Sequence, residues 1–335
     1  MGSYLNPGSF IFRNSLNSKI YVDKSGLIEK TNEYLNTEQR FLCVSRPRRF
    51  GKSMAADMLA AYYDCGDDTE ELFEGLSISQ CKSYRKHLNQ YDVLKLNMQD
   101  FLSMTHNVSD MLNLLQTRIV SELKRKYPDH ITDEPLIFAM QDIFSQTGRP
   151  FVILIDEWDC LFREYKQDKD AQKQYLDFLR AWLKDKDYVA LAYMTGILPI
   201  AKYSSGSELN MFAEFTMVNS PMFGTYFGFT DDEVDDLYER YCRECEKQRK
   251  IKNVTRKGLR DWYNGYYTKS GERVYNPRSV VFALQFNNLA NYWTSSGPYD
   301  EIYYYIRNNV SDVRDDLALM AAGESVSAKI QEYAA

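Results

Sequence analysis

The stretch that most constrains this chain runs from Ser45 to Ser53, SRPRRFGKS, and directly follows the apolar residues 41–44. A phosphate-binding loop joins a buried strand to a helix whose first N–H groups converge on the phosphates. The usual pattern is G-x-x-x-x-G-K-[ST]; its last three positions match here, and Arg46 stands in place of the first glycine. Gly-Lys-Ser alone is common by chance. The apolar run before it and the helix-forming residues after it favour a phosphate loop over an accidental basic turn.

Further apolar runs of strand length follow this loop and alternate with helical stretches. We expect strands at 41–45, 92–98, 151–155 and 188–196, and a weaker fifth candidate at 214–219. Helices are expected from about residue 25, from residue 52, and over about 108–126, 134–147 and 171–185. Strands separated by helices predict an α/β fold in which helices cover both faces of a parallel sheet.

The clearest strand, FVILIDE, ends in two acids, Asp156 and Glu157. A nucleotide-bound Mg²⁺ needs a carboxylate at the end of a neighbouring strand, because the carboxyl edge of the sheet faces the phosphates. We therefore expect Ser53 and Asp156 to hold Mg²⁺, Lys52 to reach the β- and γ-phosphates, and Glu157 to polarise the attacking water. Thr195 ends the 188–196 strand; sensing of the nucleotide and capping of a turn are equally good interpretations of it.

The nucleotide-binding residues that we predict are Pro47, Arg48, Arg49, Phe50, Gly51, Lys52, Ser53 and Met54. The arginines at 46, 48 and 49 leave several interpretations open. The four interpretations are contact with the nucleotide, a finger that reaches a neighbouring subunit, contact with nucleic acid, and pairing with acids on the surface.

Several stretches together resemble the AAA-ATPase-like family, a largely bacterial group whose members often carry a C-terminal nuclease-like domain of the PD-(D/E)XK type. The stretches are YVDKSGLIEK, FLCVSRPRRFGKS, FVILIDEWD, TGILPIAKYSSGSELNMF, YFGFTDDEV, WYNGY and VYNPRSVVFAL. The resemblance covers roughly residues 4–300 and implies a P-loop ATPase with strand order 5-1-4-3-2. Family members commonly carry the same Arg-Pro-Arg-Arg-Phe-Gly-Lys-Ser loop. The resemblance carries over to Lys52, Ser53, Asp156 and Glu157 position by position.

The resemblance fails at the end of the chain. The sequence stops at KIQEYAA, about where the nuclease-like domain of longer relatives would begin. A nuclease centre needs an acid on one strand and a Glu-x-Lys-type pair on the next, and the tail ESVSAK lacks a supporting apolar strand. We find no nuclease centre, and expect a shortened or a naturally short member of the family.

We expect two domains. Residues 1–225 would form a P-loop ATPase domain with an N-terminal extension, and residues 226–335 a smaller, mainly helical lid, with a winged-helix-like arrangement as an alternative. The second part opens with a capping box of Thr230 and Glu233 and contains a helix end, a small hairpin or turn and another helix. The polar loop from Lys202 to Phe212, with Lys202 and Glu208 as candidate contacts, is a candidate lid or substrate loop.

Charge and cysteine content disfavour some other classes of protein, although a local basic patch for nucleic acid stays open. The net charge of −6 disfavours nucleic-acid binding by bulk charge, and no apolar run reaches the ~20 residues of a membrane span. Six scattered cysteines without a signal peptide favour reduced thiols and a cytoplasmic protein. Cys242 and Cys245 form a C-x-x-C, which we interpret as two thiols on an ordinary helix because a zinc site needs further ligands.

The leading hypothesis is a cytoplasmic, Mg²⁺-dependent ATPase, with ATP rather than another nucleotide implied by the resemblance and with turnover that can be slow. One alternative is a slow nucleotide-gated switch that controls a partner or effector. Another is a nucleic-acid-associated module of a defence or mobile-element system. A homo-oligomer, an effector domain and nucleic acid stay open as partners, and a membrane is not expected.

Overall fold

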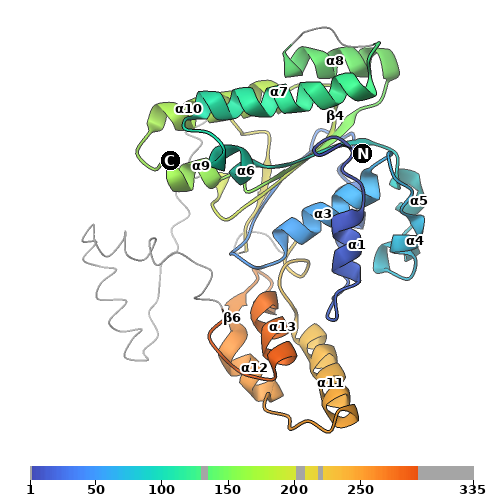
Figure 1. The fold of residues 1–335 in the computed structure, drawn as a ribbon, viewed down its shortest axis with the longest axis vertical. Coiled ribbons are helices and arrows are strands. Elements are labelled where there is room, and N and C mark those ends of the chain that lie inside the picture. The colour runs from blue at the N-terminus through green and yellow to red at the C-terminus, as the bar shows by residue number, and fades with distance from the viewer. Residues whose placement is uncertain (1, 130–134, 201–207, 218–221, 293–335) are drawn as a thin grey trace.

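The computed structural model describes residues 2–129, 135–200, 208–217 and 222–292 (Figure 1). Lys202, part of the predicted 214–219 strand and the C-terminal tail searched for a nuclease centre lie outside these residues. Figure 1 shows a sheet with helices above and below it, and a group of C-terminal helices beyond one end of the strands.

A five-stranded parallel sheet forms the centre of the fold. Its strands are β1 (Phe41–Ser45), β2 (Asp92–Asn97), β3 (Phe151–Asp156), β4 (Val189–Gly196) and β5 (Ala213–Phe215). The strands lie in the order β5-β1-β4-β3-β2, and every pairing is parallel. The predicted α/β class is therefore confirmed. In this order, as in the 5-1-4-3-2 order that the resemblance implies, β4 lies between β1 and β3, so the strand that ends in Asp156 does not pair directly with β1.

Two helical layers cover the sheet. On one face lie α6 (Met98–Ser103), α7 (Val108–Lys126), α8 (Leu136–Thr147), α9 (Cys160–Glu164) and α10 (Lys169–Leu183). On the other lie α1 (Phe10–Leu16), α2 (Gly26–Asn32), α3 (Lys52–Tyr63), α4 (Glu70–Phe73), a 3-10 turn η1 (Ser77–Gln80) and α5 (Tyr84–His87). Successive β3 side chains point to opposite faces of the sheet. Ile153 and Ile155 pack against the layer that contains α7, and Val152 and Leu154 pack against the layer that contains α3. All six β3 residues are buried, which explains the continuous apolar run of this strand.

The long predicted helices begin and end at local signals. The Asn107 side chain accepts the N–H of Asp110 at the start of α7, and Asp168 accepts that of Ala171 at the start of α10. Gly148, in the left-handed conformation at φ 64°, ends α8 just before β3. The short helices α1, α4, α5, α6 and α9 were not predicted, because four to seven residues are too few to show a helical period.

The C-terminal part has a hydrophobic core of its own. It contains α11 (Asp231–Lys247), α12 (Arg256–Tyr263), the antiparallel pair β6 (Asn264–Tyr267) and β7 (Arg273–Tyr275), and α13 (Pro277–Phe286). The predicted capping box is confirmed: the Thr230 side chain accepts the N–H of Glu233, and the Glu233 carboxylate accepts that of Thr230. Cys242 and Cys245 both lie on α11. The boundary near residue 225 stays a prediction.

Candidate functional site

The loop between β1 and α3, residues 45–53, turns through two left-handed residues. Arg49 has φ 69° and Gly51 has φ 88°, and Gly51 is the N-cap of α3. The side chain of Lys52 is 5% exposed, and its Nζ donates to the carbonyl oxygens of Arg46 (3.0 Å) and Pro47 (3.1 Å). The carbonyl groups of the loop therefore surround the ammonium group of Lys52 at the start of α3. Both this ammonium group and the dipole of the helix favour the binding of an anion at this point.

The end of β3 holds a buried carboxylate beside β4. Asp156 is 4% exposed, and its Oδ1 accepts the hydroxyl of Thr195 and, at 3.0 Å, the N–H of Glu157. Thr195 lies within β4 and is fully buried, so the interpretation of this threonine as a turn cap was wrong. Its hydroxyl instead fixes the orientation of the Asp156 carboxylate.

Glu157 begins a sharp turn after β3. Its φ of 53° is the left-handed conformation, which is uncommon for a residue with a side chain. The N–H of Trp158 then donates to the carbonyl of Thr195 (3.1 Å), which ties the turn to β4. The turn places the Glu157 side chain on the wall of the cleft described below, with Lys52 on the same wall.

Charges of opposite sign converge on Lys52. Burial lowers the pKa of the Lys52 ammonium, and the negative charges of Glu157, Asp156 and Asp159 oppose that shift. The four side chains come from loop 45–53 and from the end of β3, two segments about a hundred residues apart in the sequence. The structure thus brings the predicted Lys52, Asp156, Glu157 and Thr195 to one edge of the sheet.

Two neighbours of this cluster were missed by the sequence reasoning. Arg163 on α9 forms an ion pair with Glu157, and its Nε lies 3.6 Å from Oδ2 of Asp159. Asp159 is fully buried, and its Oδ2 accepts the N–H groups of Ile197 (3.1 Å) and Leu198 (2.9 Å). Burial raises the pKa of the Asp159 carboxyl, and Arg163 opposes the shift. Asp159 and Arg163 are four residues apart, which places two side chains next to each other on the surface of a helix. The pair could therefore have been predicted if a helix had been expected at this point.

Arg46 has a different role from the other loop arginines. It is 1% exposed, and its guanidinium donates to the carbonyls of Ser45 (2.9 Å), Phe215 (2.7 Å) and Phe223 (3.2 Å). It also lies 5.3 Å from the ring centroid of Phe227, and burial lowers its pKa to about 10. Arg46 therefore links β1 to the segment around β5 by hydrogen bonds. It neither faces the nucleotide site nor pairs with acids on the surface, so those two interpretations do not hold for Arg46.

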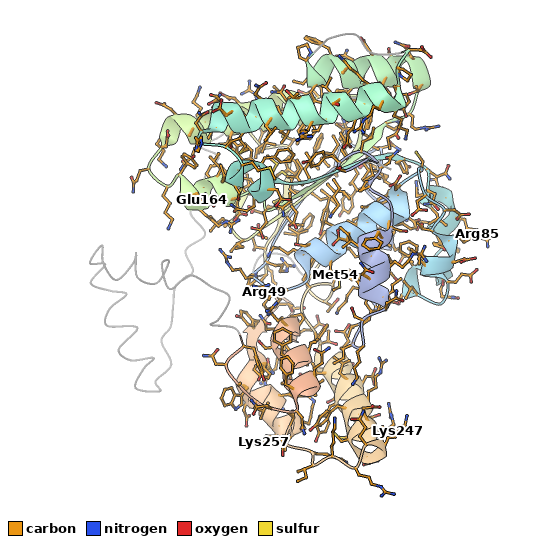
Figure 2. The ribbon with its side chains drawn as sticks, in the orientation of Figure 1. Arg49, Met54, Arg85, Glu164, Lys247 and Lys257 are labelled. Atoms are coloured by element: carbon orange, nitrogen blue, oxygen red, sulfur yellow. The ribbon has the colours of Figure 1, made fainter. Side chains whose placement is uncertain are left out.

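A cleft of about 680 Å³ opens beside the loop. Residues 18–24, the loop with the first turns of α3, and α13 form most of its wall, together with Phe12, Glu157, Tyr226, Gly228 and Phe229. Figure 2 shows Arg49 and Met54 where the central sheet meets the C-terminal helices. The predicted residues on its wall are Arg48, Arg49, Phe50, Gly51, Lys52, Ser53, Met54 and Glu157. Pro47 does not line it; Asp156 and Thr195 are buried behind it.

The cleft has a positive rim and an apolar interior. Burial and the positive charge of Arg278 on α13 lower the pKa of Arg49, so the two guanidinium groups are close enough to repel each other. Ile20, Val22 and Val281 add apolar surface. Such a combination suits a ligand with an anionic end and a flat apolar end.

The 45–53 loop is also fastened to the C-terminal part. Phe50 is 1% exposed, and its ring meets that of Tyr266 edge to face with centroids 4.8 Å apart. The Phe50 carbonyl accepts the N–H of Gly228 (3.3 Å), and a Cβ on Gly228 would lie 3.2 Å from the Phe50 ring. Phe50, predicted as a nucleotide contact, thus directs its ring toward protein. Lys24 adds a link to α11 through Glu233, with Nζ–Oε distances of 2.5 and 2.7 Å.

Comparison with known proteins agrees with this geometry. The model of the family described as "Predicted AAA-ATPase" matches residues 13–205, which include the loop, β3 and β4. The chain belongs to this predicted AAA-ATPase family. The match ends before the C-terminal part, which the family model leaves undescribed.

One relative extends further along the chain. It is a protein of Azotobacter chroococcum mcd 1 described as "Uncharacterized protein in vnfD 5'region", 25% identical over 291 residues. The alignment covers 83% of this chain and 50% of that protein, so the chain spans about half the length of the curated relative. Among the helices that the structure describes, none combines the length and the apolar composition that a bilayer crossing requires.

Proposed function

We propose that this predicted AAA-ATPase binds ATP with Mg²⁺ at the carboxyl edge of its sheet and hydrolyses it. The observation that carries the proposal is the convergence of Lys52 with Asp156 and Glu157 beside a cleft rimmed by arginines. In this proposal Lys52 and the N–H groups near Gly51 bind the β- and γ-phosphates. The hydrogen bonds from Lys52 to Arg46 and Pro47 are exchanged for bonds to phosphate oxygen.

Oxygen donors suited to Mg²⁺ flank the lysine. Mg²⁺ prefers carboxylate, hydroxyl and water oxygens and is held in such enzymes by one or two protein ligands together with phosphates. Ser53 presents an exposed hydroxyl on the first turn of α3, and Asp156 presents a carboxylate whose Oδ1 is already oriented by Thr195. When bound, Mg²⁺ would neutralise charge on the β- and γ-phosphates. Thr195 would act through Asp156 and not by direct contact with the nucleotide.

Glu157 is the residue that we propose as general base. Its side chain lines the cleft and lies within the electrostatic environment of Lys52. A carboxylate there can accept a proton from water that attacks the γ-phosphate, which contributes about 10²–10⁴-fold to a rate in typical enzymes.

The nucleoside would lie between the N-terminal segment and α13. Ile20, Val22 and Val281 offer apolar surface to a base, and Arg49 and Arg278 offer charge to phosphates. This placement supports two domains, residues 1–225 with the loop and residues 226–335 as a lid. The separate core of the C-terminal part favours the same division.

The proposal is tested by the thermal shift and affinity of the purified protein with ATP, GTP and ADP, with and without Mg²⁺. Lys52→Ala should weaken ATP binding on the order of 100-fold, because a charge-assisted contact worth about 3 kcal/mol is removed. Glu157→Gln should retain binding and lower turnover by about 100-fold or more.

Lys257→Ala is the matched control. This lysine lies on α12, has a side chain that is 85% exposed and pairs with Asp261, at the end of the molecule away from the loop (Figure 2). The control should leave both binding and turnover as they are in the unmodified protein. ATP turnover that survives Lys52→Ala and Glu157→Gln undiminished would rule out this site.

The contacts of Phe50 favour one variation of this function, a slow nucleotide-gated switch. A loop whose central ring packs on the C-terminal part would transmit a change at the phosphates to that part. Slow turnover together with a nucleotide-dependent change in protease sensitivity of residues 226–292 would support the switch. Fast turnover without any such change would support a plain ATPase.

A further inference from the structure

One guanidinium lies between two carboxylates at the edge of the proposed site. Arg163 pairs with Oε2 of Glu157, and its Nε is 3.6 Å from Oδ2 of Asp159. The side chains of Arg163, Glu157 and Asp159 are 11%, 25% and 0% exposed, so solvent screens the charge of Asp159 little and the Arg163–Glu157 pair only in part. Arg163 therefore has a close partner and a second acceptor within a small movement.

The second pairing is incomplete in a way that favours such a movement. Nε of Arg163 and Oδ1 of Asp159 are both buried, and neither has a hydrogen-bond partner in the described part of the chain. Buried donors and acceptors are normally satisfied, because unpaired ones lose their bonds to water without compensation. A shift of Arg163 from Glu157 toward Asp159 would satisfy both atoms with one guanidinium.

Asp159 is also tied to the end of β4. Its Oδ2 accepts the N–H groups of Ile197 and Leu198, the residues that follow Thr195 and Gly196. A Cβ on Gly196 would lie 2.7 Å from Oδ1 of Asp159, so the strand end and this carboxylate are in close contact. A displacement at the end of β4, where Thr195 bonds Asp156, would therefore reach Asp159 directly.

We propose that Arg163 is a positioning residue that restrains Glu157, and that Asp159 is the alternative acceptor that draws Arg163 away and releases it. The inference rests on the proposed ATPase function and concerns regulation of the same site. While paired, an N–H of Arg163 occupies Oε2 of Glu157, an oxygen that a general base would use to accept the proton of water. Movement of the β4 end is the event that shifts Arg163 between the two carboxylates.

The test combines Arg163→Gln, Asp159→Asn and the double variant, with single-turnover hydrolysis of ATP–Mg²⁺ and the Kd for ATP as separate readouts. Arg163→Gln should raise the hydrolysis rate by about fivefold, within the coupling expected of contacting residues, while the Kd stays within about twofold. Asp159→Asn should lower the rate by about fivefold, because the neutral amide still accepts the two N–H groups but attracts Arg163 less.

The double variant separates restraint from a merely structural role. If Asp159 acts through Arg163, the double variant should hydrolyse ATP as fast as Arg163→Gln alone. Arg163→Lys, which keeps the charge but not the fork of donors, should give a rate between those of the unmodified protein and Arg163→Gln. The melting temperature of each variant shows that it is folded.

The outcomes distinguish this inference from the function on which it rests. If the unmodified protein hydrolyses ATP but Arg163→Gln is equal or slower, or Asp159→Asn slows both backgrounds by the same factor, the restraint is overturned and the ATPase stands. If neither the unmodified protein nor any variant binds or hydrolyses ATP, the proposed function itself is wrong. Hydrolysis detectable only after Arg163→Gln would support both.

Discussion

Both edges of the sheet hold buried charged groups, but the hydrogen bonds of these groups are complete at one edge and incomplete at the other. At the amino edge, Asp92 begins β2 and is fully buried; Oδ1 accepts Nδ2 of Asn6 (2.8 Å) and the ammonium of Lys126, and Oδ2 accepts the hydroxyl of Tyr127. At the carboxyl edge, Oδ1 of Asp159, Nε of Arg163 and Nε1 of Trp158 are buried without a hydrogen-bond partner in the described residues.

This difference separates structural charge from charge available for chemistry. A fully satisfied network makes one arrangement rigid, whereas unpaired groups leave room for a second arrangement or for a ligand. The pKa values agree with the contrast. Burial alone would raise the pKa of Asp92, but bonds from Lys126, Tyr127 and Asn6 bring it below its ordinary value, whereas the pKa of Asp159 is raised.

The largest expected effect is on stability, from Asp92→Asn. The amide removes the negative charge that faces Lys126 and presents a donor to other donors, so the free energy of unfolding at pH 7 should fall by about 3 kcal/mol. Urea unfolding measures it. Asp159→Asn is the matched substitution and should change this free energy by less than about 1 kcal/mol. Equal losses in the two variants would break the contrast between the edges.

A second and smaller effect on stability is expected at Glu122, on the amino side of the sheet. This carboxylate is 6% exposed and accepts the N–H groups of Ser3 (2.9 Å), Tyr4 (2.9 Å) and Leu5 (2.7 Å). Glu122→Ala leaves these donors without their acceptor and should lower the free energy of unfolding by about 2 kcal/mol without change in the Kd for ATP.

Glu157→Gln sharpens the comparison with Glu122. Its pair with Arg163 is partly exposed, so this variant should lose less than about 1 kcal/mol of stability while turnover falls. Melting temperatures of the two variants, measured beside ATP turnover, decide the point. A large loss of stability from Glu157→Gln would mean that the carboxyl edge is structural too.

The smallest effect is a pair of opposite pH dependences. A lowered pKa means that Asp92 stabilises the fold above the ordinary pKa of about 4, and this contribution is lost as the pH falls through the folded-state value. A raised pKa means that Asp159 favours the fold at low pH and that this contribution is lost as the pH rises. The deficit of Asp92→Asn should therefore shrink in acid. Asp159→Asn should gain stability relative to the unmodified protein as the pH rises above the ordinary aspartate pKa of about 4.

Unfolding at several pH values tests both slopes with the same samples. Curves that run parallel for the two variants would contradict the assignment of opposite pKa shifts. If only the stability difference of Asp92→Asn changes with pH, the structural role of Asp92 at the amino edge is supported. The raised pKa assigned to Asp159 would then be contradicted.

Most of the regular structure was predictable because its signals are local. The apolar run at β3 and the capping signals of α7, α10 and α11 depend on neighbours within a few residues. The short helices were missed for the same reason, since they have too few residues to show a period. One of them, α9, carries Arg163, so this residue of the site was missed together with its helix.

The sequence alone determined that a Gly-Lys-Ser loop follows a buried strand and that two acids end another, because strand ends and loop patterns are written in consecutive residues. Only the tertiary structure decided that Arg46 bonds to the end of β5 instead of facing the cleft. It also decided that residues 18–24 and α13 form the cleft walls. These features depend on contacts between segments up to about 260 residues apart, and burial decides such contacts after the chain has packed.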